Sequence, residues 1–135
     1  MSSLEPIDIK VTLSGTYWKD KPRAKVSVDN IVIFDDEVAD EIDVKWSGEL
    51  AEGDHKLVVE LHSKDKYQTV LEDGKIVKDQ LLNIEDVTFD DISIGNLKHS
   101  LSTYDHGANC VNLGVNGCWK LKFKTPIYIW LLENL

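Results

Sequence analysis

The chain has 135 residues, 42% of them hydrophobic and 29% charged, which is typical of one globular domain with a real core. Its net charge of −9 repels phosphate backbones and argues against nucleic-acid binding. We expect no membrane segment and no secretion signal, because no apolar run approaches the ~18 residues of a span and the N-terminus lacks basic and apolar signal regions.

The acidic residues are unevenly distributed. Residues 35–54 hold nine Asp and Glu side chains against one basic residue, Lys45. Such a surface tolerates or attracts cations, and it can equally serve only to keep the protein in solution.

Period-two alternation dominates the first half of the chain and helical periodicity is nearly absent. Asp29-Asn30 marks a turn between two strands, and residues 47–53 are expected to form a loop. The predicted strands cover residues 7–13, 24–28, 31–34, 41–46 and 55–62.

The second half begins with a polar, turn-rich segment at residues 63–80 that contains Glu72-Asp73-Gly74. The apolar parity of residues 87–94 switches at Asp90-Asp91, which predicts a strand with a β-bulge. A loop is expected at residues 102–109, a hairpin at 110–123 around Asn116-Gly117, and a last apolar strand at 127–132.

About eight to ten short strands of this kind predict one all-β domain over residues 1–135, an antiparallel β-sandwich of the jelly-roll type. The last strand is apolar almost to Leu135. Because an exposed apolar edge strand aggregates, we expect it to pair centrally or against a partner chain.

The two cysteines are predicted to be free thiols. In the expected hairpin Cys110 lies opposite Phe123 and Cys118 opposite Val115, so a disulfide between them is geometrically disfavoured. No Cys/His spacing resembles a zinc site.

Catalysis is poorly supported, and we expect a protein that is not an enzyme. There is no Gly-x-Ser-x-Gly nucleophile elbow, and the adjacent pairs Asp35-Asp36 and Asp90-Asp91 point to opposite faces of a strand. They cannot act together as a glycosidase acid and nucleophile. The four histidines, His55, His62, His99 and His106, have no matched partner in the sequence.

Calcium is the better-supported chemistry, because Ca²⁺ is bound by six to eight oxygen ligands. Gly74 does not belong to an EF-hand, since that register puts Thr69, Leu71 and Gln80 where acids are required. The candidate ligands are three carboxylates in one loop-rich segment, Asp65, Asp73 and Asp79. The alternative is a solvated acidic loop.

Several aromatic residues lie in predicted loops, where a ring can stack on a sugar while polar neighbours bind its hydroxyls. The candidate ligand-binding residues are Trp18, Tyr67, Tyr104 and, at the end of the neighbouring strand, His62. Packing is the alternative role for Trp18. Trp46, Trp119 and Trp130 lie on alternating segments and are expected in the core.

Residues 24–95 carry a resemblance to calcium-dependent xylan-binding modules, carbohydrate-binding families thirty-six and sixty. The motifs are Gly53-Asp54-His55 at the start of a strand, Lys64-Asp65 at its end, residues 79–87, and a Val26-x-Val28-Asp29 turn. Lys64 stands in place of an Asn of the family motif and Gln80 in place of an Arg. The resemblance implies a non-catalytic module in which Asp65 and Asp79 bind Ca²⁺, and sugar hydroxyls complete the coordination.

The C-terminal part, residues 109–135, is similar to a form of this domain found as small proteins of tailed phages. We therefore expect a polysaccharide or host-surface glycan as ligand, with synthesis in the host cytoplasm followed by a place on a virion or outside the cell. The alternative is a virion structural or decoration protein that uses the sandwich without sugar or metal. It would contact a virion or homo-oligomer partner through the C-terminal strand.

Overall fold

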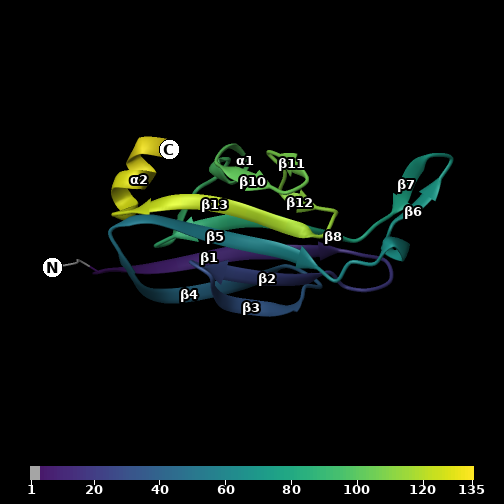
Figure 1. The fold of residues 1–135 in the computed structure, drawn as a ribbon, viewed down its shortest axis with the longest axis horizontal. Coiled ribbons are helices and arrows are strands. Elements are labelled where there is room, and N and C mark those ends of the chain that lie inside the picture. Colours follow the sequence, from purple (N-terminus) through teal and green to yellow (C-terminus); the bar gives the residue numbers. More distant parts are fainter. Residues whose placement is uncertain (1–3) are drawn as a thin grey trace.

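The computed structural model describes residues 4–135, which form two antiparallel sheets packed face to face and a small separate hairpin (Figure 1). The first sheet contains β1 (Leu4–Thr16), β4 (Ile42–Ala51), β8 (Leu81–Phe89), β9 (Ile92–Ser93) and β12 (Asn112–Leu113). The second contains β2 (Arg23–Val28), β3 (Ile31–Glu37), β5 (Gly53–His62), β10 (Ser102–Tyr104), β11 (Gly107–Ala108) and β13 (Gly117–Thr125).

The strand order is β12-β8-β1-β4 in the first sheet, with β9 also on β8, and β11-β10-β13-β5-β2-β3 in the second. Every pairing among residues 4–135 is antiparallel. The prediction of an all-β antiparallel sandwich is confirmed.

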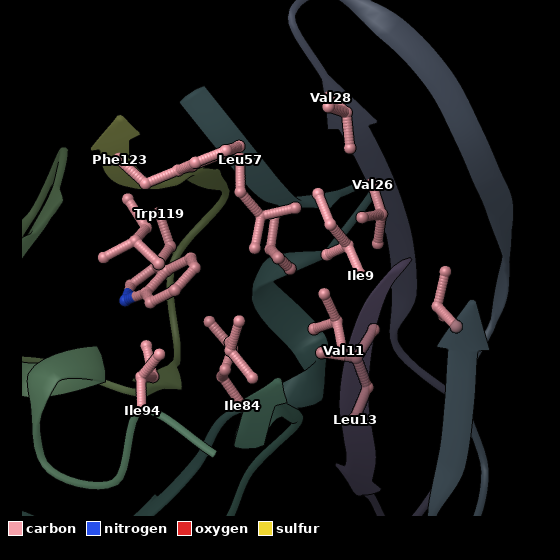
Figure 2. Close-up of a cluster of buried hydrophobic side chains, with 14 of the residues drawn as sticks. Ile9, Val11, Leu13, Val26, Val28, Leu57, Ile84, Ile94, Trp119 and Phe123 are labelled. Carbon is pink, nitrogen blue, oxygen red and sulfur yellow. The ribbon is translucent and has the colours of Figure 1, made fainter. Parts of the chain in front are cut away.

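The core lies between the sheets and is supplied by alternate residues of the central strands. Figure 2 shows side chains from β1, β2, β5, β8 and β13 meeting there, among them Ile9, Leu57 and Phe123. Trp119 is fully buried in this layer, and within residues 4–135 its indole Nε1 has no hydrogen-bond partner. Trp119 and Trp130 are core residues as expected, and Trp46 packs against the core from a half-buried position.

Three two-residue turns with Asp in the left-handed region connect paired strands. The φ angles are 49° and 69° at Asp29-Asn30, 52° and 77° at Asp73-Gly74, and 50° and 66° at Asp90-Asp91. Two successive left-handed residues match the twist of a tight hairpin, and Asp, Asn and Gly tolerate this conformation best. The first turn confirms the prediction at Asp29-Asn30.

The predicted β-bulge at Asp90-Asp91 is wrong. The chain reverses there, and Phe89 pairs with Ile92 across the turn between β8 and β9. A bulge and a two-residue reversal both shift the apolar parity, so the pattern alone did not separate them.

The loop predicted at residues 47–53 is also wrong, because β4 continues to Ala51 and β5 begins at Gly53. The long strand β1 supplies backbone partners along this whole stretch, from Asp8 opposite Ser47 to Leu4 opposite Ala51. Inward-facing Leu50 is buried, which adds packing to the pairing.

The predicted hairpin at residues 110–123 does not form. β12 pairs with β8 in the first sheet, whereas β13 pairs with β5 and β10 in the second. Burial of Trp119, Leu121 and Phe123 against the core therefore outweighs the local turn preference of Asn116-Gly117. Cys110 and Cys118 are nevertheless free thiols, as expected.

The C-terminal segment is a helix rather than the predicted strand. α2 (Ile127–Asn134) follows Pro126, and the Glu5 carboxylate accepts a hydrogen bond from the Ile127 N–H, at 3.1 Å from Oε2. Ile127, Trp130 and Leu131 are buried at helical spacing. The segment is apolar on nearly every side, so its hydrophobic pattern fits a short strand as well as a helix. A second helix, α1 (Leu97–Ser100), is one turn long.

Candidate functional site

The candidate site lies at the end of the sandwich opposite α2 (Figure 1). It is built around residues 63–80, which join β5 to β8 and contain the 3₁₀ turn η1 (Lys66–Gln68) and the hairpin of β6 (Val70–Glu72) and β7 (Lys75–Lys78). Residues 17–22 and 114–116 contact this segment. We call these three segments the loop end.

A largely buried ion pair fixes the loop end. Lys64 Nζ donates a hydrogen bond to Asp79 Oδ1 at 2.7 Å and another to the carbonyl of Gly114. The two side chains are only 8% and 17% exposed. One ammonium group thus holds the two ends of residues 63–80 together and joins them to residues 114–116.

The same Asp79 oxygen accepts two further hydrogen bonds, from Thr69 Oγ1 at 2.6 Å and from the Gln80 N–H at 2.8 Å. Burial alone raises the pKa of the Asp79 carboxyl. The hydrogen bonds from Lys64, Thr69 and Gln80, together with the charge of Lys64, outweigh that effect and hold the pKa below its ordinary value of 3.8. Asp79 is therefore held as an anion matched to an internal cation.

The three predicted calcium ligands are not brought together. Asp65 is exposed and caps η1 by accepting from the Tyr67 N–H at 2.8 Å, and Asp73 lies in the β6–β7 turn. Asp79 already faces the Lys64 ammonium. Among residues 4–135, no group of three or more His, Cys, Asp or Glu side chains is arranged to hold a metal ion. This arrangement does not fit Ca²⁺ unless Lys64 first leaves Asp79.

The segments that carry two of the predicted ligand-binding rings, Trp18 and Tyr67, are brought together. The Trp18 indole Nε1 donates to the carbonyl of Gln68 at 2.8 Å, which places Trp18 beside the residue that follows Tyr67. The rings remain accessible, with Trp18 42% and Tyr67 63% exposed.

A hollow of about 300 Å³, lined mostly by polar and charged residues, lies on the same segment as Tyr67. Asn116 closes one side of it, because its side chain accepts from the Lys64 N–H at 2.9 Å and donates to the Lys64 carbonyl at 3.0 Å. The lining residues are Lys64, Asp65, Lys66, Thr69, Gly114, Val115 and Asn116.

Tyr104 supports the wall of this hollow. Its hydroxyl donates to the Val115 carbonyl and accepts from the Val115 N–H at 3.2 Å. Burial raises the pKa of the Tyr104 phenol above its ordinary value. Because both backbone groups of Val115 engage the hydroxyl, Tyr104 fixes the position of Val115 at the hollow.

His62 contacts Ser63 and Asp35. Its Nε2 is 3.0 Å from Asp35 Oδ1 and its Nδ1 is 2.9 Å from Ser63 Oγ. Asp35 is on β3, so the histidine links β5 to the outer strand of the second sheet.

Two glutamines with no recognisable motif organise the loop end. Buried Gln68 donates to Asp20 Oδ2 at 2.8 Å and accepts from the Asp20 N–H at 3.3 Å. Buried Gln80 donates to the Asp20 carbonyl, also at 2.8 Å. A buried Gln in a polar segment has no sequence signature, since only the fold supplies its partners.

A second hollow, of about 220 Å³, lies on the first sheet and has a lining of mixed charge that includes Asp8, Lys10, Lys45 and Asp91. Ser47 Oγ donates to Asp8 Oδ1 there at 2.6 Å. Trp46 is its only aromatic lining residue and is half-buried, so this hollow offers less ring surface than the loop end.

No family model, no curated protein and no solved structure matches the chain. Within residues 4–135, no helix combines the length and the apolar character needed to cross a membrane. The geometry of the site is accordingly the basis for a functional proposal.

Proposed function

We propose that this protein is a non-catalytic carbohydrate-binding module and that it contacts glycans at the loop end. The observation that carries the proposal is that the exposed Trp18 is anchored to the backbone beside the exposed Tyr67, in a segment that also lines a hollow rich in polar side chains. Aromatic faces bury the apolar face of a pyranose, and neighbouring amide, hydroxyl and ammonium groups bind its hydroxyls.

The Trp18 ring is well suited to stacking because its orientation is fixed before a ligand arrives. Its indole N–H is satisfied by Gln68, whose side chain is itself anchored to Asp20. A ring that is already ordered loses little conformational freedom on binding. The hollow supplies the polar component of the same surface through Lys66, Thr69 and Asn116.

Calorimetric titration against a panel of neutral and acidic oligosaccharides tests this proposal. Trp18→Ala and Tyr67→Ala are each expected to weaken binding at least about fivefold, which corresponds to losing roughly 1 kcal/mol of contact. Tyr128→Ala is the matched control, because Tyr128 is also an exposed tyrosine but lies on α2 at the opposite end. Absence of binding to every glycan, or equal effects of all three substitutions, contradicts the proposal.

Calcium dependence stays a prediction, and the same titration with Ca²⁺ and with EDTA tests it. If Ca²⁺ binds, it competes with the Lys64 ammonium for Asp79. Ca²⁺ is then expected to raise the melting temperature of Lys64→Met more than that of the wild type, because a ligand of the folded state stabilises it. Asp79→Ala is expected to abolish any Ca²⁺ effect. A melting temperature that Ca²⁺ leaves unchanged in all three proteins contradicts the prediction.

A specific observation favours a second candidate, an assembly role such as that of a virion protein. The apolar surface of α2 is exposed and forms a hollow of about 270 Å³ lined by Ile92, Tyr128, Leu131, Leu132 and Leu135. The carboxylates of Asp90, Glu5 and Asp91 lie near Tyr128 in this lining. A hydrogen bond with Asp90 and the charges of these carboxylates raise the pKa of Tyr128. We call this surface the helix end.

The acidic residues near Tyr128 identify the chemistry of a partner. Two copies of the helix end would place like charges against each other, in a chain whose net charge is already −9. A partner chain with an apolar ridge flanked by Lys or Arg is complementary instead. This corrects the expectation of a contact through a C-terminal strand, because a helix occupies that position.

Fluorescence polarisation with two designed helical peptides, one of Leu and Lys and one of Leu and Glu, tests the assembly candidate. The Leu/Lys peptide is expected to bind, and Leu132→Ser, which leaves the charge unchanged, is expected to weaken it. Equal binding to both proteins contradicts an apolar docking surface. Self-association seen by sedimentation velocity, if abolished by Leu132→Ser, identifies a second copy as the occupant.

A further inference from the structure

The two candidate stacking rings each carry a lysine ammonium group over the ring. Lys78 Nζ lies 4.9 Å from the centre of the Trp18 ring, and Lys66 Nζ lies 5.2 Å from the centre of the Tyr67 ring. From this arrangement we infer that the ligand is an anionic glycan, one whose sugars bear carboxylate or sulfate groups. The inference rests on the proposed glycan-binding function and adds the class of sugar.

The distribution of charge separates the loop end from the rest of the chain. Residues 17–22 and 63–80 contain six Lys and five Asp or Glu residues, whereas the remaining chain contains nine Lys or Arg and nineteen Asp or Glu residues. The acidic excess therefore lies outside the loop end. An anionic ligand meets less repulsion at the loop end than elsewhere on the molecule.

Several loop-end carboxylates are already engaged by neighbours. Asp79 pairs with Lys64, Asp65 accepts from the Tyr67 N–H, and Asp20 accepts from Gln68 Nε2. Within residues 4–135, neither Lys66 nor Lys78 forms a salt bridge with a carboxylate. Both ammonium groups are thus available to an external anion.

The cation–ring geometry indicates how such a ligand would be bound. An ammonium resting over a ring is held weakly when exposed, and a ligand anion can draw it aside. The sugar then stacks on the ring while its carboxylate or sulfate pairs with the displaced ammonium. A neutral sugar leaves both lysines without an anionic partner and has to displace them for no electrostatic gain.

A nucleic acid also combines anionic groups with flat rings, and the charge of the whole chain is what disfavours it. Phosphate backbones extend along a protein surface and here would run from the loop end onto a strongly acidic surface. A short acidic oligosaccharide, in contrast, can contact the loop end without reaching the acidic surface. An oligothymidylate is therefore included in the test as a competing polyanion.

The experiment is a calorimetric comparison of five hexameric ligands with the full chain at low and high salt: oligogalacturonate, a sulfated galactan oligosaccharide, xylohexaose, polyglutamate and oligothymidylate. The two acidic sugars are expected to bind at least about tenfold more tightly than xylohexaose at low salt, with a smaller ratio at high salt. Whichever acidic sugar binds more tightly identifies carboxylate or sulfate as the preferred group.

Variants that remove or conserve the lysine charge show whether Lys66 and Lys78 cause the preference for acidic sugars. Lys66→Met and Lys78→Met are each expected to weaken binding of the acidic sugars about three- to tenfold, which is more than either weakens binding of xylohexaose. Lys66→Arg and Lys78→Arg are expected to retain most of the affinity. Lys122→Met is the matched control, since Lys122 is exposed on β13 outside the loop end and its loss changes net charge equally.

The outcomes distinguish this inference from the function on which it rests. Xylohexaose binding as tight as that of the acidic sugars, with no effect of the lysine variants, overturns the anionic class and leaves glycan binding standing. If polyglutamate or oligothymidylate binds as tightly as the acidic sugars, both the anionic-glycan inference and the glycan-binding proposal are overturned. The loop end would then bind anions without recognising the sugar ring. No binding to any sugar likewise overturns both.

Discussion

The loop end and the helix end differ in how their exposed surfaces are held. At the loop end, one ammonium group, one carboxylate and two buried glutamines tie three loops together through hydrogen bonds, and the rings of Trp18 and Tyr67 rest on that frame. At the helix end, α2 is held by three buried apolar side chains, and the exposed side chains next to them are also apolar.

Because of this difference, substitutions at the loop end and at the helix end are expected to have different effects on stability. The loop end is held by hydrogen bonds, which are directional, so removing one partner leaves another buried polar group unpaired. An apolar helix face is held by buried area, so an exposed side chain contributes little to folding and is free to serve a partner. Substitutions in the loop-end hydrogen-bond network are therefore expected to affect both binding and stability. Substitutions of exposed residues at the helix end are expected to affect binding of a partner without a large change in stability.

The largest effect on stability is expected from a pair of neighbouring leucines on α2. Leu131 is 3% exposed and Leu132 is 82% exposed. Leu131→Ala is expected to lower the free energy of unfolding by about 2–4 kcal/mol, because it removes buried methyl groups and leaves a cavity. Leu132→Ala is expected to change it by less than about 0.5 kcal/mol.

Urea denaturation of the two variants checks this prediction. Both substitutions have the same chemistry in the same helix, so differences in helix propensity cancel. Similar losses for both variants would show that burial does not divide α2 into a core face and a free face.

A smaller effect is expected from the ion pair at the loop end. Lys64→Met is expected to cost about 2 kcal/mol, below the full value for a buried pair because Asp79 is partly exposed. At this chain length each kcal/mol lowers the melting temperature by about 3–5 °C.

The double variant Lys64→Met/Asp79→Leu is the control for this prediction. Removing both charges leaves no uncompensated carboxylate, so it is expected to be more stable than Lys64→Met alone. Thermal melts of the three proteins measure the difference. A Lys64→Met protein as stable as the wild type would indicate that the pair is no stronger than a surface salt bridge.

The sequence predicted the sandwich because its central strands obey one simple rule. In β1 apolar residues alternate with polar ones from Ile7 to Leu13, and in β5 the buried residues Leu57, Val59 and Leu61 occupy alternate positions. The same rule does not work for α2, where Tyr128, Ile129 and Leu132 are as apolar as the buried positions between them. A helix there depends on the shape of the core that receives Trp130 and Leu131.

The sequence predicted which residues lie in the loops of the candidate site, but it did not predict how those residues are arranged in space. Loop positions for Trp18 and Tyr67 follow from their polar neighbours in the sequence, but their proximity depends on a hydrogen bond to the Gln68 backbone that no motif encodes. Asp79 was predicted as a metal ligand on the strength of its position. In the structure Asp79 instead pairs with the Lys64 ammonium. The sequence does not show this pairing, because it depends on how the loop folds back on itself.

The smallest expected effect is a pH dependence that distinguishes Asp79 from exposed carboxylates. The pKa of Asp79 in the folded state lies below its ordinary value of 3.8, so as pH falls the unfolded chain takes up a proton at this position before the folded protein does. The stabilisation from Asp79 is therefore present above about pH 4 and is lost as pH falls through the folded-state pKa.

Denaturation free energies measured between about pH 5 and pH 2.5 test that sign by comparing wild type with Asp79→Asn. The difference in stability between the two proteins is expected to shrink toward the acidic end of this range, because protonation removes the charge that the substitution has already removed. Asp73→Asn is the control, since Asp73 is exposed in the β6–β7 turn and Asn tolerates its left-handed conformation equally well. A difference that is constant with pH would mean that the Lys64 ammonium does not stabilise the Asp79 anion, and the loop-end frame would then rest on the uncharged hydrogen bonds of Gln68 and Gln80.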